Sequence, residues 1–155
     1  MHVGVDTLAL PLVATRVGEN EATLSPDGRW LAYTSEETGR PEVYVRPFPL
    51  VNSGKWMASA EGGAVPVWAH SGRELFYRNG AAQLVAAEIQ TNPTFSVPRQ
   101  STLFALEGFF SGFDHPAYDV SPDDQRFVML RAASSDSHLI VVQNFLEELK
   151  KKVGR

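Results

Sequence analysis

Three copies of a short polar turn between apolar runs constrain the fold of this chain more than any other feature. The segment LSPDGRWLAY at 24–33 aligns without a gap with WAHSGRELFY at 68–77 and with VSPDDQRFVM at 120–129. Repeats of this kind indicate a fold built from equivalent units, each of which buries its apolar face against its neighbour.

The turn residues predict a β-hairpin in each copy. Serine suits the first position of a type I turn, proline presets φ at the second, and glycine tolerates the left-handed backbone that closes the loop. The first copy has all of these residues, in Ser25-Pro26-Asp27-Gly28. In the second copy His70 stands where the proline would be, and in the third Asp124 replaces the glycine as a weaker substitute.

Segments rich in β-branched and aromatic residues flank and follow each turn, which predicts up to four strands per unit. The copies begin 44 and 52 residues apart, close to the roughly 40–45 residues of a four-stranded propeller blade. We therefore expect an all-β fold in a single domain, 1–155: a partial β-propeller of about three four-stranded blades. The predicted blades are residues 20–60, 64–105 and 116–143.

The two ends of the chain carry further predictions. Phe145, Leu146, Leu149 and Val153 have helical spacing after a possible cap at Asn144, which predicts a short C-terminal helix at 144–153. The third unit thus lacks a fourth strand. The segment 11–15 precedes the first hairpin and is predicted to be a strand that completes a blade.

Three blades leave two open edges, whereas complete propellers have four to eight blades. We expect two chains to form a homodimer, in which a six-bladed ring is closed and each N-terminal strand completes the third blade of the other chain. A truncated fragment, or an open unit capped by the helix, is the alternative.

Composition limits the partners and the location. The net charge of −4 and the pI near 5.5 argue against a nucleic-acid partner. No cysteine is present, so thiolate chemistry is excluded. Residues 1–17 lack the pattern of a signal peptide and no segment is long and apolar enough for a membrane span. We expect a soluble protein, cytoplasmic by default.

The repeats resemble a known family. LSPDGRWLAYTSEETGRPEVYVRPFP, GGAVPVWAHSGRELFY and YDVSPDDQRFVML are similar to TolB-like propeller repeats, also called PD40 or WD40-like. The similarity is closest to propeller regions associated with bacterial serine/threonine kinases and related sensor proteins. It implies a propeller that binds proteins or peptides, although related propellers also precede hydrolase domains.

Two groups of residues are candidates for binding. Asp114, His115 and Asp119 form a polar stretch that could hold a ligand, although a plain polar loop is the favoured interpretation and no metal site is expected. Phe109, Phe110 and Phe113 lie in a glycine-containing loop and are either buried between blades or part of a contact surface, with burial favoured.

No catalytic motif is present. The chain lacks a Gly-x-Ser-x-Gly elbow, a phosphate-binding glycine loop and a zinc-type histidine spacing. We expect a non-catalytic binding or scaffold propeller without a cofactor, which presents a face or a central channel to a protein, peptide or small ligand. The alternative is an enzyme, a hydrolase or lyase, whose site is assembled in the channel of the dimer.

Overall fold

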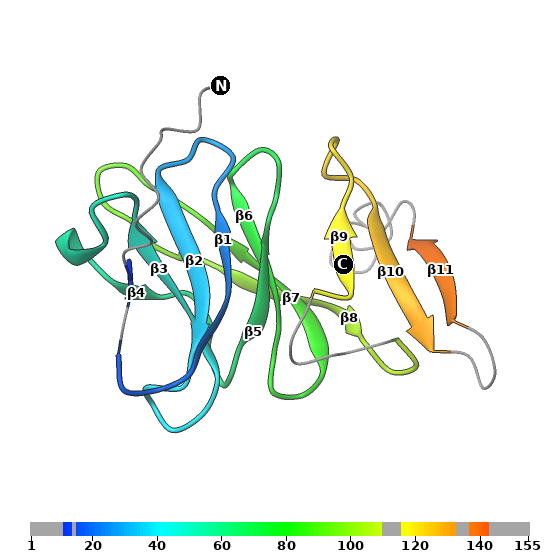
Figure 1. Ribbon diagram of the computed structural model, residues 1–155. Helices are drawn as coiled ribbons and strands as arrows, with labels where there is room; N and C mark the ends of the chain where they lie inside the picture. Colours follow the sequence, from blue (N-terminus) through cyan, green and yellow to red (C-terminus); the bar gives the residue numbers. More distant parts are fainter. Residues whose placement is uncertain (1–10, 14, 110–115, 133–136, 143–155) are drawn as a thin grey trace, which may run out of the picture.

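The computed structural model describes residues 11–13, 15–109, 116–132 and 137–142, which form three antiparallel sheets in succession along the chain (Figure 1). Blade 1 contains β1 (Glu19–Leu24), β2 (Trp30–Ser35), β3 (Glu42–Pro47), the 3-10 helix η1 (Val51–Ser53) and β4 (Trp56–Met57). Blade 2 contains β5 (Ala64–Trp68), β6 (Glu74–Arg78), β7 (Gln83–Glu88) and β8 (Gln100–Ala105). Blade 3 contains β9 (Tyr118–Val120), β10 (Phe127–Ala132) and β11 (Ser137–Val142).

The predicted all-β partial propeller is confirmed. In every blade the strands follow their order in the sequence across the sheet, as a meander does. The first strands of the blades are neighbours, since β1 lies against β5 and β5 against β9. Sheets that radiate from a shared set of inner strands are the architecture of a propeller.

The polar turns form the predicted hairpins. In blade 1 the Ser25 hydroxyl donates to Asp27 at 2.6 Å and accepts the backbone N–H of Trp30 at 3.0 Å. Ser121, Asp123 and Arg126 repeat these contacts in blade 3. Gly28 and Gly72 both have φ of 69°, the left-handed conformation that the turn requires.

Asp124 also has a left-handed φ, of 56°, and its carboxylate gives this substitution a second role. Its Oδ1 accepts the backbone N–H of His70 at 2.7 Å and its Oδ2 that of Ser71 at 2.9 Å. A proline at position 70 would have no N–H to donate. The two departures from the Ser-Pro-Asp-Gly pattern therefore complement each other and connect the turns of blades 2 and 3.

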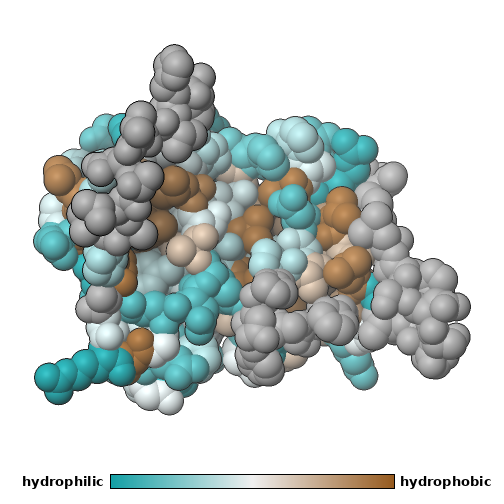
Figure 2. All heavy atoms as spheres, viewed as in Figure 1, coloured by the Kyte–Doolittle hydropathy of each residue, from teal (hydrophilic) through white to brown (hydrophobic). Residues whose placement is uncertain are grey.

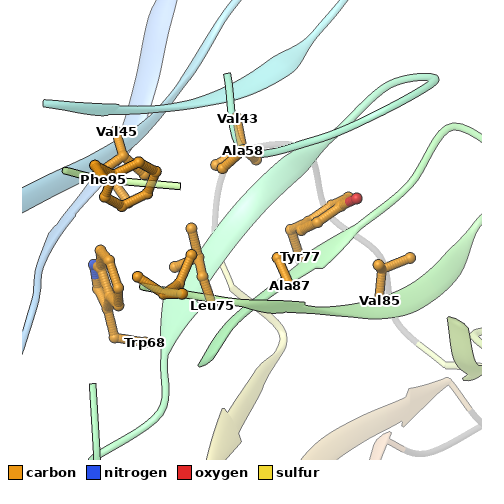
Figure 3. Close-up of a cluster of buried hydrophobic side chains, with 11 residues drawn as sticks. Val43, Val45, Ala58, Trp68, Leu75, Tyr77, Val85, Ala87 and Phe95 are labelled. Carbon is orange, nitrogen blue, oxygen red and sulfur yellow. The ribbon is translucent and has the colours of Figure 1, made fainter. Parts of the chain in front are cut away.

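Each blade has two faces, which we name the N-side face, toward the preceding blade, and the C-side face, toward the following one. Directly paired residues share a face. The C-side face of blade 1 packs on the N-side face of blade 2, as the close-up in Figure 3 shows. Blade 1 supplies Ala32, Val43, Val45 and Ala58 to this cluster, and blade 2 supplies Trp68, Leu75, Tyr77, Val85, Ala87, Ile89 and Phe95.

The same arrangement holds between blades 2 and 3. Phe76, Leu84 and Ala86 on the C-side face of blade 2 pack against Val120, Phe127 and Met129 of blade 3. Phe76 and Phe127 make an edge-to-face contact with ring centroids 4.9 Å apart. Burial of each large apolar side chain contributes about 1.5–3 kcal/mol. Packing between faces, rather than pairing between sheets, therefore holds the blades together.

Both predictions for the ends of the chain remain predictions. Pro11, Leu12, Val13 and Thr15 lie outside strands in the single chain. An isolated extended segment needs the edge of another sheet to pair with, and its predicted partner was a second chain. The predicted helix at 144–153 lies outside the described residues. Within the described residues, blade 3 has three strands.

Candidate axis-facing binding surface

The inner strands of the three blades line a shallow cavity of about 380 Å³ on the side where a propeller has its axis. We name the residues of this cavity the axis-facing surface. They are Glu21, Ala22 and Thr23 of β1, Val65, Pro66 and Val67 of β5, and Pro116, Tyr118 and Asp119 at β9. Figure 2, viewed from the same side as Figure 1, shows hydrophilic and apolar residues interspersed over this side of the molecule.

A β-bulge in each of the first two inner strands shapes the surface. The register of β1 with β2 shifts between Asn20 and Thr23, and that of β5 with β6 shifts between Ala64 and Val67. The bulged residues Glu21 and Val65 both have φ of 59° and occupy equivalent positions in their repeats. A bulge bends a strand and redirects its side chains. Here it turns the Glu21 carboxylate toward blade 2.

Glu21 connects the first two blades through one carboxylate oxygen. Its Oε2 accepts the Thr34 hydroxyl at 2.8 Å and the backbone N–H of Val65 at 2.7 Å. Its Oε1 is buried and has no hydrogen-bond partner among the residues described. A buried oxygen without a partner is costly, so Glu21 retains an unsatisfied acceptor beneath the axis-facing surface.

Tyr118 makes the corresponding connection from blade 3. Its hydroxyl donates to the Val65 carbonyl at 2.6 Å. The ring is buried, and this burial, together with the negative charges of Glu21 and Asp119, raises the pKa of Tyr118 well above its usual value. The phenol therefore stays protonated and acts as a donor. Val65, a β-branched residue in the left-handed region, is held on both sides by neighbouring blades.

The structure places Asp119 on the axis-facing surface. Its side chain is exposed in the middle of β9 and accepts the backbone N–H of Val120 at 2.8 Å. Asp114 and His115, predicted beside it, lie outside the described residues. Glu21, which the sequence analysis did not identify, lies on this surface instead. The signal was available, because the equivalent repeat positions hold Val65 and Ala117, and one carboxylate among apolar residues is unusual.

The phenylalanine loop is only partly described. Phe109 is half-buried, packs against the cluster between blades 2 and 3, and forms an isolated bridge with Arg131. Its amide donates to the Leu106 carbonyl at 3.0 Å. The burial that was favoured for the loop as a whole remains a prediction. Phe110 and Phe113 lie outside the described residues.

The axis-facing surface is acidic. Its described lining contains two carboxylates, Glu21 and Asp119, and no lysine, arginine or histidine. Within the described ranges, no three side chains of the metal-binding types come close enough to hold an ion. With these two carboxylates the surface can offer hydrogen-bond acceptors and negative charge to a ligand.

The described part of the chain contains no helix long and apolar enough to cross a membrane.

No protein-family model matches this sequence, and no curated protein is similar to it. Solved structures, in contrast, share its fold. The oligogalacturonate lyase of Vibrio parahaemolyticus aligns over 85% of this chain and 40% of its own, with a TM-score of 0.61 and 12% identity. An oligogalacturonate lyase in complex with manganese aligns over 84% and 36%, with a TM-score of 0.58 and 15% identity.

TolB from Acinetobacter baumannii also aligns, over 86% of this chain and 43% of its own, with 11% identity and a TM-score of 0.43. The chain thus spans about two fifths of the length of the structures that it matches. The two lyases are β-propellers. Together with the succession of sheets described above, this similarity identifies the chain as part of a β-propeller.

Proposed function

We propose that this chain is a non-catalytic binding propeller and that its axis-facing surface binds a basic segment of a protein or peptide. The observation that carries the proposal is the buried Oε1 of Glu21, which has no hydrogen-bond partner in the described part of the chain. An ammonium or guanidinium group of a ligand would supply the missing donor when the carboxyl group turns toward the cavity, since Oε1 itself is buried. Hydrogen bonds between charged groups are about twice as strong as neutral ones.

The shape of the surface supports a peptide-like ligand. Three inner strands present it side by side, and β1, β5 and β9 each pair on one side only within the described sheets. Apart from the N–H and C=O of Val65, which Glu21 and Tyr118 engage, unpaired backbone groups of such strands are available to an extended segment. Asp119 lies on β9, two blades away from Glu21 on β1, so the two carboxylates can contact different residues of one ligand.

The repeat sequences support a finer assignment. We propose that the blades are TolB-like repeats, of the kind found in propeller regions associated with bacterial kinases and sensor proteins. Ser25-Pro26-Asp27-Gly28 and Ser121-Pro122-Asp123-Asp124, together with their hairpin geometry, are the features that support it.

An enzyme is the alternative, since two of the structures with a similar fold are oligogalacturonate lyases. Oligogalacturonate is a polyanion, and the described lining of the axis-facing surface contributes only negative charge. Like charges repel at close range. The acidic surface therefore favours the binding propeller over a lyase that acts on this substrate at this position.

We also propose that a second copy of the chain closes the ring. Leu24, Leu31, Tyr33, Tyr44 and Met57 share the N-side face of blade 1 by direct pairing. Leu24 is 45% exposed and Met57 46%, whereas Trp68, the equivalent of Leu24 in blade 2, is only 5% exposed because blade 1 covers it. The C-side face of blade 3, with Leu130 40% exposed, supplies the matching surface in a second copy.

Fluorescence anisotropy with labelled peptides tests the binding proposal. Short peptides that contain lysine or arginine are compared with matched peptides in which glutamate replaces the basic residues. We expect only basic peptides to bind, and we expect about tenfold weaker binding to Asp119→Asn or Glu21→Gln. Glu107→Gln, an exposed carboxylate outside the surface, is the control.

Two results would count against the proposal. The first is equal binding of basic and acidic peptides. The second is equal affinity of basic peptides for the wild type and for the Glu21→Gln/Asp119→Asn double variant. Either result would mean that the axis-facing surface does not bind basic peptides through its carboxylates. Formation of an unsaturated product from oligogalacturonate in the presence of manganese would favour the enzyme instead.

A further inference from the structure

A second, larger cavity lies between blades 2 and 3, away from the inner strands. Its volume is about 540 Å³. Its walls come from the C-side face of blade 2 and from the turn of blade 3, and its lining residues are Ser71, Arg73, Glu74, Ala86, Glu88, Arg99, Ser101, Leu103, Asp123, Asp124 and Gln125. We name it the interblade pocket.

The interface between blades 1 and 2 shows what fills this space when no pocket is present. There Trp30 and Trp56 project from the C-side face of blade 1, and Phe95 from the connection between β7 and β8 packs against both. The ring centroids of Phe95 lie 5.1 Å from Trp30 and 5.3 Å from Trp56. Three aromatic rings thus close the first interface.

The repeat shows why the second interface is open. Glu74 occupies the position of Trp30 in its copy of the repeat. Trp56 pairs with Val45 in blade 1, and Ser101 pairs with Ala86, the equivalent of Val45, in blade 2. Two tryptophans are therefore replaced by a carboxylate and a small hydroxyl at matched positions. The volume of two indole rings becomes space that a ligand can occupy.

The charges that line the interblade pocket favour a cation. Four carboxylates face two arginines among its described residues. Arg99 lies 3.8 Å from Glu88, and Asp124 is engaged by the amides of His70 and Ser71. Asp123 pairs with Arg126 at 3.0 Å. Glu74 has no such partner among the described residues, and burial together with the charges of Asp124 and Glu88 raises its pKa. Burial is the larger cause of this rise, but the nearby charges of Asp124 and Glu88 that contribute to it also attract a positive ligand.

We propose that the interblade pocket binds a small organic cation that carries an aromatic ring, with its ammonium group on Glu74 and its ring against Ala86 and Leu103. The ring takes the place that indole and phenyl side chains fill in the first interface. Ser101 leaves room for it, and the half-buried carboxylate supplies the ionic contact. This site is separate from the axis-facing surface, and its occupation does not require a closed ring.

Tryptamine is the probe, with tryptophol as its neutral analogue and indole-3-acetate as its anionic one. Titrations followed by backbone amide shifts in the NMR spectrum report both the affinity and the location. We expect tryptamine alone to shift the amides of Glu74, Ser101 and Leu103. In Glu74→Gln we expect about tenfold weaker binding, because the ionic hydrogen bond is lost.

Ser101→Trp is the second variant, since it places a tryptophan where blade 1 carries Trp56. We expect this variant to remain folded and to lose tryptamine binding, because the ring fills the pocket. Glu107→Gln is the matched control for the charge change and should bind tryptamine as the wild type does.

Several outcomes would overturn the proposal. These are equal binding of tryptamine and tryptophol, unchanged affinity in a folded Glu74→Gln protein, and shifts confined to residues of the axis-facing surface. Absence of any shift at the pocket with millimolar tryptamine would also overturn it, and would mean that another part of the chain or nothing at all occupies the space. Shifts confined to the axis-facing surface would support cation binding there, whereas the other results leave the proposal of basic-peptide binding untouched.

Discussion

The Oε2 atom of Glu21 lies 2.7 Å from the backbone nitrogen of Val65, and this contact joins blade 1 to blade 2 at their inner strands. The Val65 carbonyl accepts the Tyr118 hydroxyl of blade 3 at 2.6 Å. One bulged residue is thus held by side chains from both neighbouring blades. Apolar packing can slide, whereas these bonds have fixed directions, so they define the register of the three blades.

Removal of the Tyr118 hydroxyl tests this connection. We expect Tyr118→Phe to lower the free energy of unfolding by about 1–3 kcal/mol, because the buried Val65 carbonyl loses its donor while the ring still packs. Chemical denaturation measures the change. Tyr77→Phe is the comparison, since that hydroxyl donates at 3.2 Å to the side chain of Gln100, an exposed residue. A loss no larger than that of Tyr77→Phe would contradict the special role of Tyr118.

The carboxylate of Asp124 predicts a dependence of stability on pH. Burial alone would raise the pKa of Asp124, but the amides of Ser71 and His70 hold it below its usual value. We expect Asp124→Asn to cost about 1–2 kcal/mol at neutral pH, because asparagine has a single acceptor oxygen and its NH2 group faces an N–H donor, so one of the two bonds is lost together with the charge. Asparagine tolerates the same left-handed backbone, so the turn itself should be kept.

The difference between the wild type and Asp124→Asn should shrink in acid. The folded-state pKa of Asp124 is lower than the unfolded value near 3.9, so its contribution is complete above about pH 5 and is lost as the pH falls through the folded-state pKa. Urea unfolding at several pH values measures this. A difference that stays constant as the pH falls from neutral to about 3 would contradict the role of the ionised carboxylate.

Gly63 lies where no side chain fits. A Cβ atom there would approach the Cβ of Ser59 to 2.4 Å and its Oγ to 2.7 Å. Ser59 is buried and donates at 2.5 Å to Glu42, itself only 1% exposed. We expect Gly63→Ala to destabilise the protein by about 1–3 kcal/mol through displacement of this pair. Gly18→Ala is the control, since its Cβ would meet nothing within 3.7 Å; thermal melting compares the two.

Ring closure by a second copy predicts a dimer that depends on two exposed leucines. Sedimentation equilibrium should give twice the mass of the 17.1 kDa chain. We expect either Leu24→Glu or Leu130→Glu to yield folded monomers, because a charge buried between two blades is costly. Thr94→Glu adds a charge at an exposed position of blade 2 and should leave the mass unchanged. A monomeric wild-type protein would refute this closure.

The repeat was enough to predict most of the strands. The turns of all three copies form hairpins as expected, and the first two blades have the four strands predicted per unit. Local chemistry decides these elements, because proline, serine and glycine act on the backbone of their own turn. The bulges at Glu21 and Val65 were not predicted, since they depend on contacts between residues of different blades.

The candidate site was predicted only in part. Asp119 was identified as a polar residue near an inner strand, but its association with Glu21 requires that β1 and β9 face one axis. The interblade pocket could not be found in the same way. The repeat alignment already places Glu74 at the position of Trp30, but the match of Ser101 with Trp56 depends on strand pairing that only the structure shows.

The sequence by itself determined the blades, because the turn residues and the alternation of apolar side chains act over a few neighbouring positions. Only the tertiary structure decided which carboxylates converge and which interface stays open. Those properties arise from contacts between residues that are 44 or more positions apart in the sequence. Examples are the bonds of the Glu21 and Asp124 carboxylates with the backbone N–H groups of Val65 and His70. Their proximity is set by how one sheet packs on the next, and packing depends on the shapes of both faces together.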